Sequence, residues 1–219
     1  MKTGSSPFLS PRKRPKQARS TQLVADILEA AIRVLMAEGA HRFTMARVAE
    51  RAGVSVGSVY QYFPNKQAIL FRLQADEWKA TDHLLEAILS DASLPPLERL
   101  RRSVHAFFRT EYEEVKLRTA LNDAAPLYRE APDAREHRGT GTRQMQRFLR
   151  AAWPGIPPAE LKFAAELVTA STAAIGKKIS EQARSEAQVD AFAEAVGDML
   201  SAYLQSYFDR KQPKSGPSV

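Results

Sequence analysis

The stretch that decides the fold runs from residue 44 to residue 66 and reads TMARVAERAGVSVGSVYQYFPNK. It contains two short helical patterns, over 45–52 and 56–63, joined by three residues that begin with Gly53. Glycine adopts the left-handed backbone that ends a helix without steric strain, and Pro64 cannot continue the second helix. The stretch therefore predicts a tight corner between two helices.

The predicted helix over 56–63 has two different faces. Val56, Val59 and Phe63 recur at helical spacing and predict an apolar stripe that packs on the two preceding helices. The opposite face is small and polar, which suits a helix offered to the major groove of DNA, because small side chains permit close approach and serine and glutamine can read base edges. This polar face consists of Ser55, Gly57, Ser58 and Gln61.

Four further side chains border the polar face. Tyr60 and Tyr62 flank it, and their hydroxyl groups can donate hydrogen bonds to phosphate oxygens. Thr44 and Lys66 each stand at the start of a helix beside the corner, where side chains and free backbone amides can bind the DNA backbone. A structural interpretation stays open for these residues: Thr44 and Ser55 can be helix caps alone, and the tyrosines can be half-buried core residues.

Outward from this stretch, apolar residues keep a helical period along most of the chain, and no useful β-alternation occurs. The sequence therefore predicts an all-α fold. A first helix is expected from Ser20 to Gly39, and residues 119–132, which contain two prolines, are predicted to be irregular. The other long helices are expected over about 66–90, 97–118, 133–152, 158–182 and 187–208.

Composition excludes several kinds of site. The chain has no cysteine, which excludes disulfides, thiolate metal sites and cysteine nucleophiles. Its four histidines show no metal-ligand spacing and no catalytic motif is present, so we predict no metal, no cofactor and no enzymatic activity. No apolar run is long enough to span a membrane, and the first 20 residues lack an apolar signal segment, so a soluble cytoplasmic protein is expected.

The net charge of +7 is concentrated near the start of the chain. Residues 1–20 carry six basic side chains and no acid, residues 21–80 carry seven basic and six acidic ones, and the remaining residues carry 19 of each sign. A basic front end on a neutral body favours a polyanion such as DNA as partner. Residues 1–18 are predicted to form a disordered arm that can reach an adjacent minor groove, and a solvated tail without a partner is the alternative.

The corner and its flanks resemble the signature of the tetracycline-repressor (TetR) family of bacterial regulators. The resemblance covers about residues 20–70 and implies a three-helix DNA-binding domain on a larger helical domain that dimerises and binds a ligand. The matching positions are Phe43, Thr44, Val48, Ala49, Ala52, Gly53, Val54, Ser55, Gly57, Tyr60, Tyr62, Phe63 and Lys66.

Carried over by motif position, the resemblance implies that Val59 and Phe63 form the core behind the DNA-contacting residues. Val56 stands at a position that is often polar or basic in the family, so a base contact from this residue stays open. The predicted DNA-binding residues are Thr44, Ser55, Val56, Gly57, Ser58, Tyr60, Gln61, Tyr62 and Lys66.

The predicted organisation is an arm over 1–18, a helix-turn-helix domain over 19–66, a ligand-binding and dimerisation domain over 67–210, and a disordered tail over 211–219. Because one short recognition helix cannot specify a long site, a two-fold homodimer is expected. Its predicted interface is a four-helix bundle from helices 158–182 and 187–208 of each subunit. Small residues in these helices allow close packing, although the alanines can instead be present only as good helix formers. The small residues are Ala164, Ala165, Ala170, Ala173, Ala174 and Gly176.

A small apolar or amphipathic molecule is the expected effector. The resemblance implies a repressor whose ligand binding opposes its binding to a palindromic double-stranded operator. An activator of the same fold and a sequence-neutral DNA-packaging protein stay open as alternatives. The residues predicted to line the ligand pocket, each of which can instead be ordinary core, are Trp78, His105, Phe108, Tyr112, Met145 and Phe148.

Overall fold

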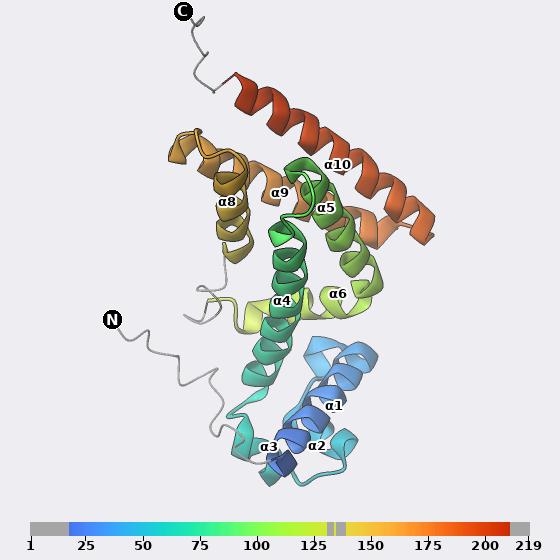
Figure 1. Ribbon diagram of the computed structural model, residues 1–219. Helices are drawn as coiled ribbons and strands as arrows, with labels where there is room; N and C mark the ends of the chain where they lie inside the picture. The colour runs from blue at the N-terminus through green and yellow to red at the C-terminus, as the bar shows by residue number, and fades with distance from the viewer. Residues whose placement is uncertain (1–17, 131–133, 135–138, 211–219) are drawn as a thin grey trace, which may run out of the picture. The chain divides into compact units, whose positions relative to one another are not determined.

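The computed structural model describes residues 18–130, 134 and 139–210. Every regular element within these residues is a helix, which confirms the predicted all-α class (Figure 1). The chain divides into two compact units. The first comprises Met1–Ala80 and Lys116–Arg138, and the second comprises Thr81–Val115 and Gly139–Val219.

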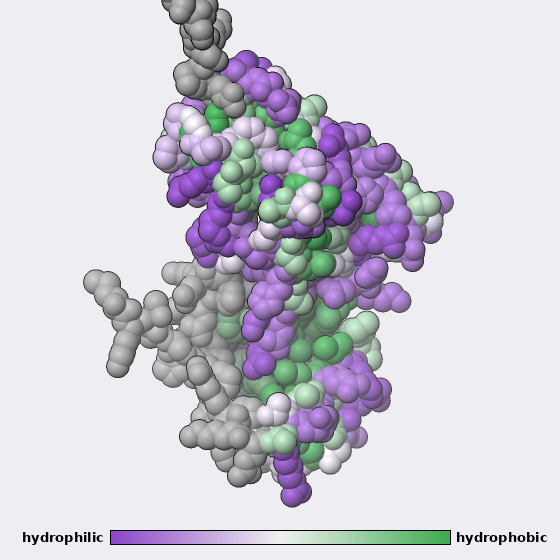
Figure 2. Space-filling view, in the orientation of Figure 1, coloured by the Kyte–Doolittle hydropathy of each residue, from purple (hydrophilic) through white to green (hydrophobic). Residues whose placement is uncertain are grey.

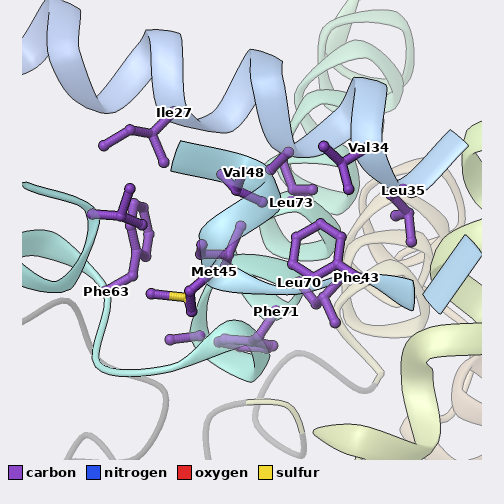
Figure 3. Close-up of a cluster of buried hydrophobic side chains, with 14 of the residues drawn as sticks. Ile27, Val34, Leu35, Phe43, Met45, Val48, Phe63, Leu70, Phe71 and Leu73 are labelled. Carbon is purple, nitrogen blue, oxygen red and sulfur yellow. The ribbon is translucent and has the colours of Figure 1, made fainter. Parts of the chain in front are cut away.

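The first unit begins with three helices and the first part of a fourth, and it is completed by residues from Lys116 onward. The four helices are α1 (Ala18–Arg42), α2 (Met45–Ala52), α3 (Val56–Tyr62) and α4 (Lys66–Ser90), of which α4 supplies residues to both units. The core places apolar side chains from α1 and α2 against Phe63 and the first turns of α4 (Figure 3). Its largest fully buried members are Ile27, Leu35, Phe43, Phe63, Ile69, Leu70 and Leu121.

Several helix boundaries differ from those expected. The helix expected over 97–118 ends at Glu113, and the one expected over 133–152 contains Gly139, whose φ of 82° is not helical, so a helix begins after it, at Thr140. Gly39 interrupts α1 with a backbone at φ 74°, as predicted, but helical residues resume beyond it to Arg42. The segment expected to be irregular from residue 119 is helical as far as Ala124, in α6 (Val115–Ala124), and then forms a 3-10 turn, η1 (Ala125–Leu127). The turn accommodates Pro126 because the first turn of a helix does not need that residue's N–H.

The second unit consists of long helices with one shared core. α5 (Pro96–Glu113) packs along α10 (Glu186–Asp209) and also against α9 (Pro158–Gln182), and α8 (Thr140–Ala152) packs on α9 (Figure 1). α5 and α9 both begin with a proline, whose missing N–H would be unpaired there in any case. The core of this unit joins apolar residues from all four helices and the end of α4.

Hydrophilic and hydrophobic side chains share the visible surface (Figure 2). Among the described residues, no helix combines the length and the hydropathy that crossing a membrane requires. Several large apolar side chains are nevertheless exposed on α9 and α10, namely Phe163, Leu167, Phe192 and Met199.

Candidate nucleic-acid interface

The corner between α2 and α3 is held by local hydrogen bonds. Thr44 caps α2, its Oγ1 accepting from the Arg47 N–H at 3.3 Å. Gly53 ends that helix with left-handed dihedrals of φ 68° and ψ 30°, and its N–H donates to the Glu50 carbonyl at 3.1 Å. The next amide, of Val54, donates to the Ala49 carbonyl at 3.0 Å, so the turn satisfies the last carbonyls of the helix.

Ser55 then starts α3. Its Oγ accepts from the Ser58 N–H at 3.0 Å, and the two hydroxyl oxygens lie 2.8 Å apart. The capping role considered for Thr44 and Ser55 is therefore confirmed. Both side chains remain exposed, so each retains a lone pair or proton for a further partner.

The surface of α3 divides into a buried and an exposed side, as the sequence predicted. Val59 and Phe63 are fully buried in the core of the first unit. The opposite side is exposed at Ser55, Gly57, Tyr60 and Gln61, and half-buried at Ser58.

The predicted apolar stripe of Val56, Val59 and Phe63 was wrong at its first member. Val56 is 39% exposed, because it lies about 40° from Tyr60 around the helix but about 60° from Val59. Phe63 is no longer helical, with φ −120° and ψ 121°, so the expected seven-residue spacing does not apply to it. Val56 thus joins the exposed side of α3.

Two residues predicted to contact DNA are less accessible than the others. Tyr62 is only 5% exposed and belongs to the core of the first unit, which favours the structural interpretation of its ring. Lys66 is half-buried as the first residue of α4. The adjoining Asn65 caps this helix, its Oδ1 accepting from the Ala68 N–H at 2.8 Å.

The backbone conformation that requires glycine at position 53 is absent at Gly57. Its backbone is not left-handed, and a Cβ built on it would contact only Ser55 Oγ, at an ordinary 3.7 Å. Glycine inside a helix costs about 0.5–1 kcal/mol relative to alanine. The protein's own packing therefore does not require glycine at this position.

The predicted ligand-pocket residues are not all in one core. Phe108, Met145 and Phe148 are buried in the second unit, with Tyr112 packed against them, whereas Trp78 packs against the core of the first unit. His105 is half-buried on α5. The structure therefore does not bring the six residues together, and the pocket stays a prediction.

The small residues predicted for a dimer bundle also separate into two groups. Ala164, Ala165 and Gly176 are buried within their own subunit, where Gly176 meets Phe107 of α5. Ala170, Ala173 and Ala174 are exposed and free to meet a partner.

Sequence reasoning missed a buried polar network in the first unit. Arg118 of α6 pairs with Glu77 of α4 at 2.6 Å, and both side chains are almost fully buried. Gln74 and Tyr128 extend the network. The available signal was that Gln74 and Glu77 continue the helix face begun by the buried Leu70, where charged residues are uncommon unless they are paired.

This fold and its exposed corner define a helix-turn-helix protein with a second helical unit. Two family models match the chain: "Bacterial regulatory proteins, tetR family" over residues 27–73 and "Tetracyclin repressor-like, C-terminal domain" over residues 95–207. The chain belongs to the TetR family of bacterial regulators, which confirms the resemblance noted in the sequence.

Two curated relatives come from Pseudomonas putida. The probable HTH-type transcriptional regulator ArpR is 36% identical over 91 residues, and the HTH-type transcriptional regulator TtgR is 35% identical over 91 residues. Each match spans 42% of this chain and 42% of the relative, so the chain matches about two-fifths of the length of these proteins.

Solved structures of other proteins share most of this fold. The transcriptional regulator FadR from Bacillus subtilis in complex with stearoyl-CoA matches with a TM-score of 0.68 and 16% identity, over 82% of this chain and 98% of that one. A transcriptional regulator from Pseudomonas aeruginosa PAO1 matches with a TM-score of 0.68 and 19% identity, over 88% and 96%. Both comparisons support the fold.

Proposed function

We propose that this chain is a sequence-specific transcriptional regulator that binds operator DNA as a homodimer. One observation carries the proposal: α3 is anchored by Val59 and Phe63 while its other side is exposed, small and polar. A helix that enters the major groove needs one side anchored in the protein core and the other side accessible to the bases.

The contacts divide by chemistry. Gln61 and Ser58 are suited to base edges, and Gly57 lets the helix approach the groove closely. Tyr60, at 41% exposed, can donate to a phosphate, and Thr44 and Lys66 flank the corner at the starts of α2 and α4. The remaining members of the proposed set are Ser55, Val56 and Tyr62, the last through its hydroxyl group alone.

The exposed apolar residues of the second unit support a two-fold dimer. Along α9 and α10 these residues recur at alternating spacings of three and four, which is the pattern of a helix-helix seam. Phe163 and Met199 are more than half exposed despite their size, so a partner subunit would remove much apolar surface from water. The proposed seam consists of Phe163, Leu167, Ala170 and Ala174 on α9 with Phe192, Ala195, Met199 and Ala202 on α10.

The second unit is also the proposed site of effector binding, with repression relieved by a small apolar or amphipathic ligand. Its core is rich in aromatic and soft side chains, such as Phe108, Met145 and Phe148. The stearoyl-CoA held by the FadR relative is an amphipathic molecule of the proposed kind. Ligand and DNA would oppose each other only to the extent that the ligand binds the two states unequally.

The basic arm over 1–18 lies outside the described residues except for Ala18. We propose that the arm adds phosphate and minor-groove contacts beside the helix-turn-helix corner, since it holds five of the six basic side chains of residues 1–20. Removing it should weaken binding and flatten the dependence of affinity on salt.

Fluorescence anisotropy with labelled duplexes tests the function. The DNA upstream of the protein's own gene is compared with random duplex of equal length at several salt concentrations. A regulator should prefer its site by roughly 10³-fold or more, and Gln61→Ala should reduce that preference while the exposed Arg147→Ala in the second unit should not. Equal affinity for both duplexes would instead indicate a sequence-neutral DNA-packaging protein.

A further inference from the structure

The first unit is not made from the start of the chain alone. Its core includes four buried residues from a segment that begins at Lys116, some 50 residues after the corner has ended. Both ends of this segment continue directly into the second unit, at Val115 and Gly139. The buried residues that it contributes are Leu121, Ala124, Tyr128 and Ala134.

A buried ion pair joins this segment to α4. Arg118 Nη2 lies 2.6 Å from Glu77 Oε1, and the side chains are only 11% and 6% exposed. A charge removed from water in this way is tolerated only with a well-placed partner, so each of the two residues fixes the position of the other.

Hydrogen bonds continue the network on the same side of α4. Gln74 Nε2 donates to Glu77 Oε2 at 3.0 Å, and the buried Tyr128 hydroxyl lies 3.3 Å from Gln74 Oε1 and 3.2 Å from the Leu121 carbonyl. Burial, and secondarily the charge of Glu77, raises the pKa of Tyr128, so this hydroxyl keeps its proton and acts as a donor.

The network lies far from the exposed side of α3 but on the helix that follows it. Only Phe63, Pro64 and Asn65 separate α3 from α4, and Glu77 is about 16 Å along α4 from Lys66. The first turns of α4 are buried at Ala68, Ile69 and Leu70. Because these residues share one core with Phe63, a change in how α4 is held can reach the core behind α3 without any contact between the network and DNA.

We propose that Arg118, acting through Glu77, is a positioning residue for DNA recognition, and that the segment from Lys116 is a required part of the DNA-binding unit. This proposal rests on the proposed function for its DNA readout. The segment holds the first half of α4, and α4 holds Phe63 and α3 in the geometry that the major groove requires.

The test compares Arg118→Met, Arg118→Lys, the double variant Glu77→Gln with Arg118→Met, and Arg147→Met as the matched control. Arg147 pairs with Glu86 in the second unit, but both side chains are at least half exposed. Arg118→Met, measured well below its unfolding temperature, should lose operator affinity by about tenfold or more with an unchanged salt slope, because no phosphate contact is lost. Arg118→Lys and the double variant should recover most of the loss, and Arg147→Met should bind normally.

Hydrogen exchange without DNA gives a second measurement that does not depend on the proposed function. In Arg118→Met, amides of α2 and α3 should exchange faster while those of α5 and α10 stay as in the natural sequence, because the loss is local. If the unsubstituted protein bound no DNA selectively, the proposed regulatory function would be rejected. The exchange pattern would still test the positioning role of Arg118. Unchanged exchange in α2 and α3, or full operator affinity in Arg118→Met, would overturn the inference, as would a reduced salt slope that marks Arg118 as a direct contact.

Discussion

A methyl group placed on Gly176 of α9 would lie 2.9 Å from Cε1 of Phe107 on α5. Carbon atoms do not approach so closely, so the two helices pack at a distance that only glycine permits. Gly176→Ala should destabilise the protein by roughly 1–3 kcal/mol, despite the higher helix propensity of alanine. Denaturant unfolding measures the effect, and a variant as stable as the natural protein would show that the Phe107 ring moves aside freely.

Gly53→Ala tests the corner by backbone geometry alone. Nothing lies within 4 Å of a Cβ built at Gly53, but its φ of 68° is strained for any residue with a side chain. We expect a loss of about 1–2 kcal/mol in the free energy of unfolding, measured by thermal or denaturant unfolding. Gly53→Asn should lose less, since asparagine tolerates the left-handed region better.

Gly57→Ala should separate stability from DNA binding. The backbone of Gly57 is helical and its surroundings are open, so alanine should raise the free energy of unfolding by about 0.5–1 kcal/mol. The added methyl group would project from the side of α3 proposed to enter the major groove, so operator affinity should fall. Unfolding and anisotropy measurements on one preparation test both, and a stabilised variant with undiminished affinity would remove Gly57 from the interface.

The proposed dimer seam can be tested with charge. Phe163→Glu and Met199→Glu place a carboxylate on side chains that are 55% and 51% exposed in a single subunit, so neither substitution should damage the fold. Each should shift the protein toward monomer in size-exclusion chromatography with light scattering, because an unpaired charge would be buried at the seam. The exposed Ala187→Glu at the start of α10, outside the seam, serves as control.

The hydrogen bond made by Tyr207 predicts that the folded protein loses stability at alkaline pH. Its hydroxyl donates to Glu160, and this hydrogen bond, aided by burial, raises the pKa of Tyr207 from 10 to about 12. The folded state holds the phenolic proton more tightly than the unfolded state, so the stabilisation is complete below pH 10 and is lost as the pH rises toward 12. Glu160→Gln should lessen this dependence between pH 10 and 12, as measured by unfolding at a series of pH values.

The two-sided character of α3 was predictable because it depends on neighbours in the sequence. Glycine at a left-handed position, a serine cap and apolar residues at helical spacing act within a few residues of one another. The same reasoning misplaced Val56, because this residue lies about 40° from the exposed Tyr60 around the helix, and because Phe63, with which it was grouped, lies beyond the end of α3. Helix ends are set partly by packing, which a periodic pattern does not contain.

The sequence by itself determined the helical class, the corner around Gly53, the capping of α2 and α3 and the family of the protein. Only the tertiary structure decided that a segment beginning at Lys116 completes the first core, that Glu77 and Arg118 pair inside it, and that Ala164 and Ala174 differ in burial. The physical reason is the distance along the chain over which each interaction acts. Caps and dihedral preferences act between near neighbours, whereas burial and ion pairing join residues about 40 positions apart, whose meeting depends on how the whole chain closes on itself.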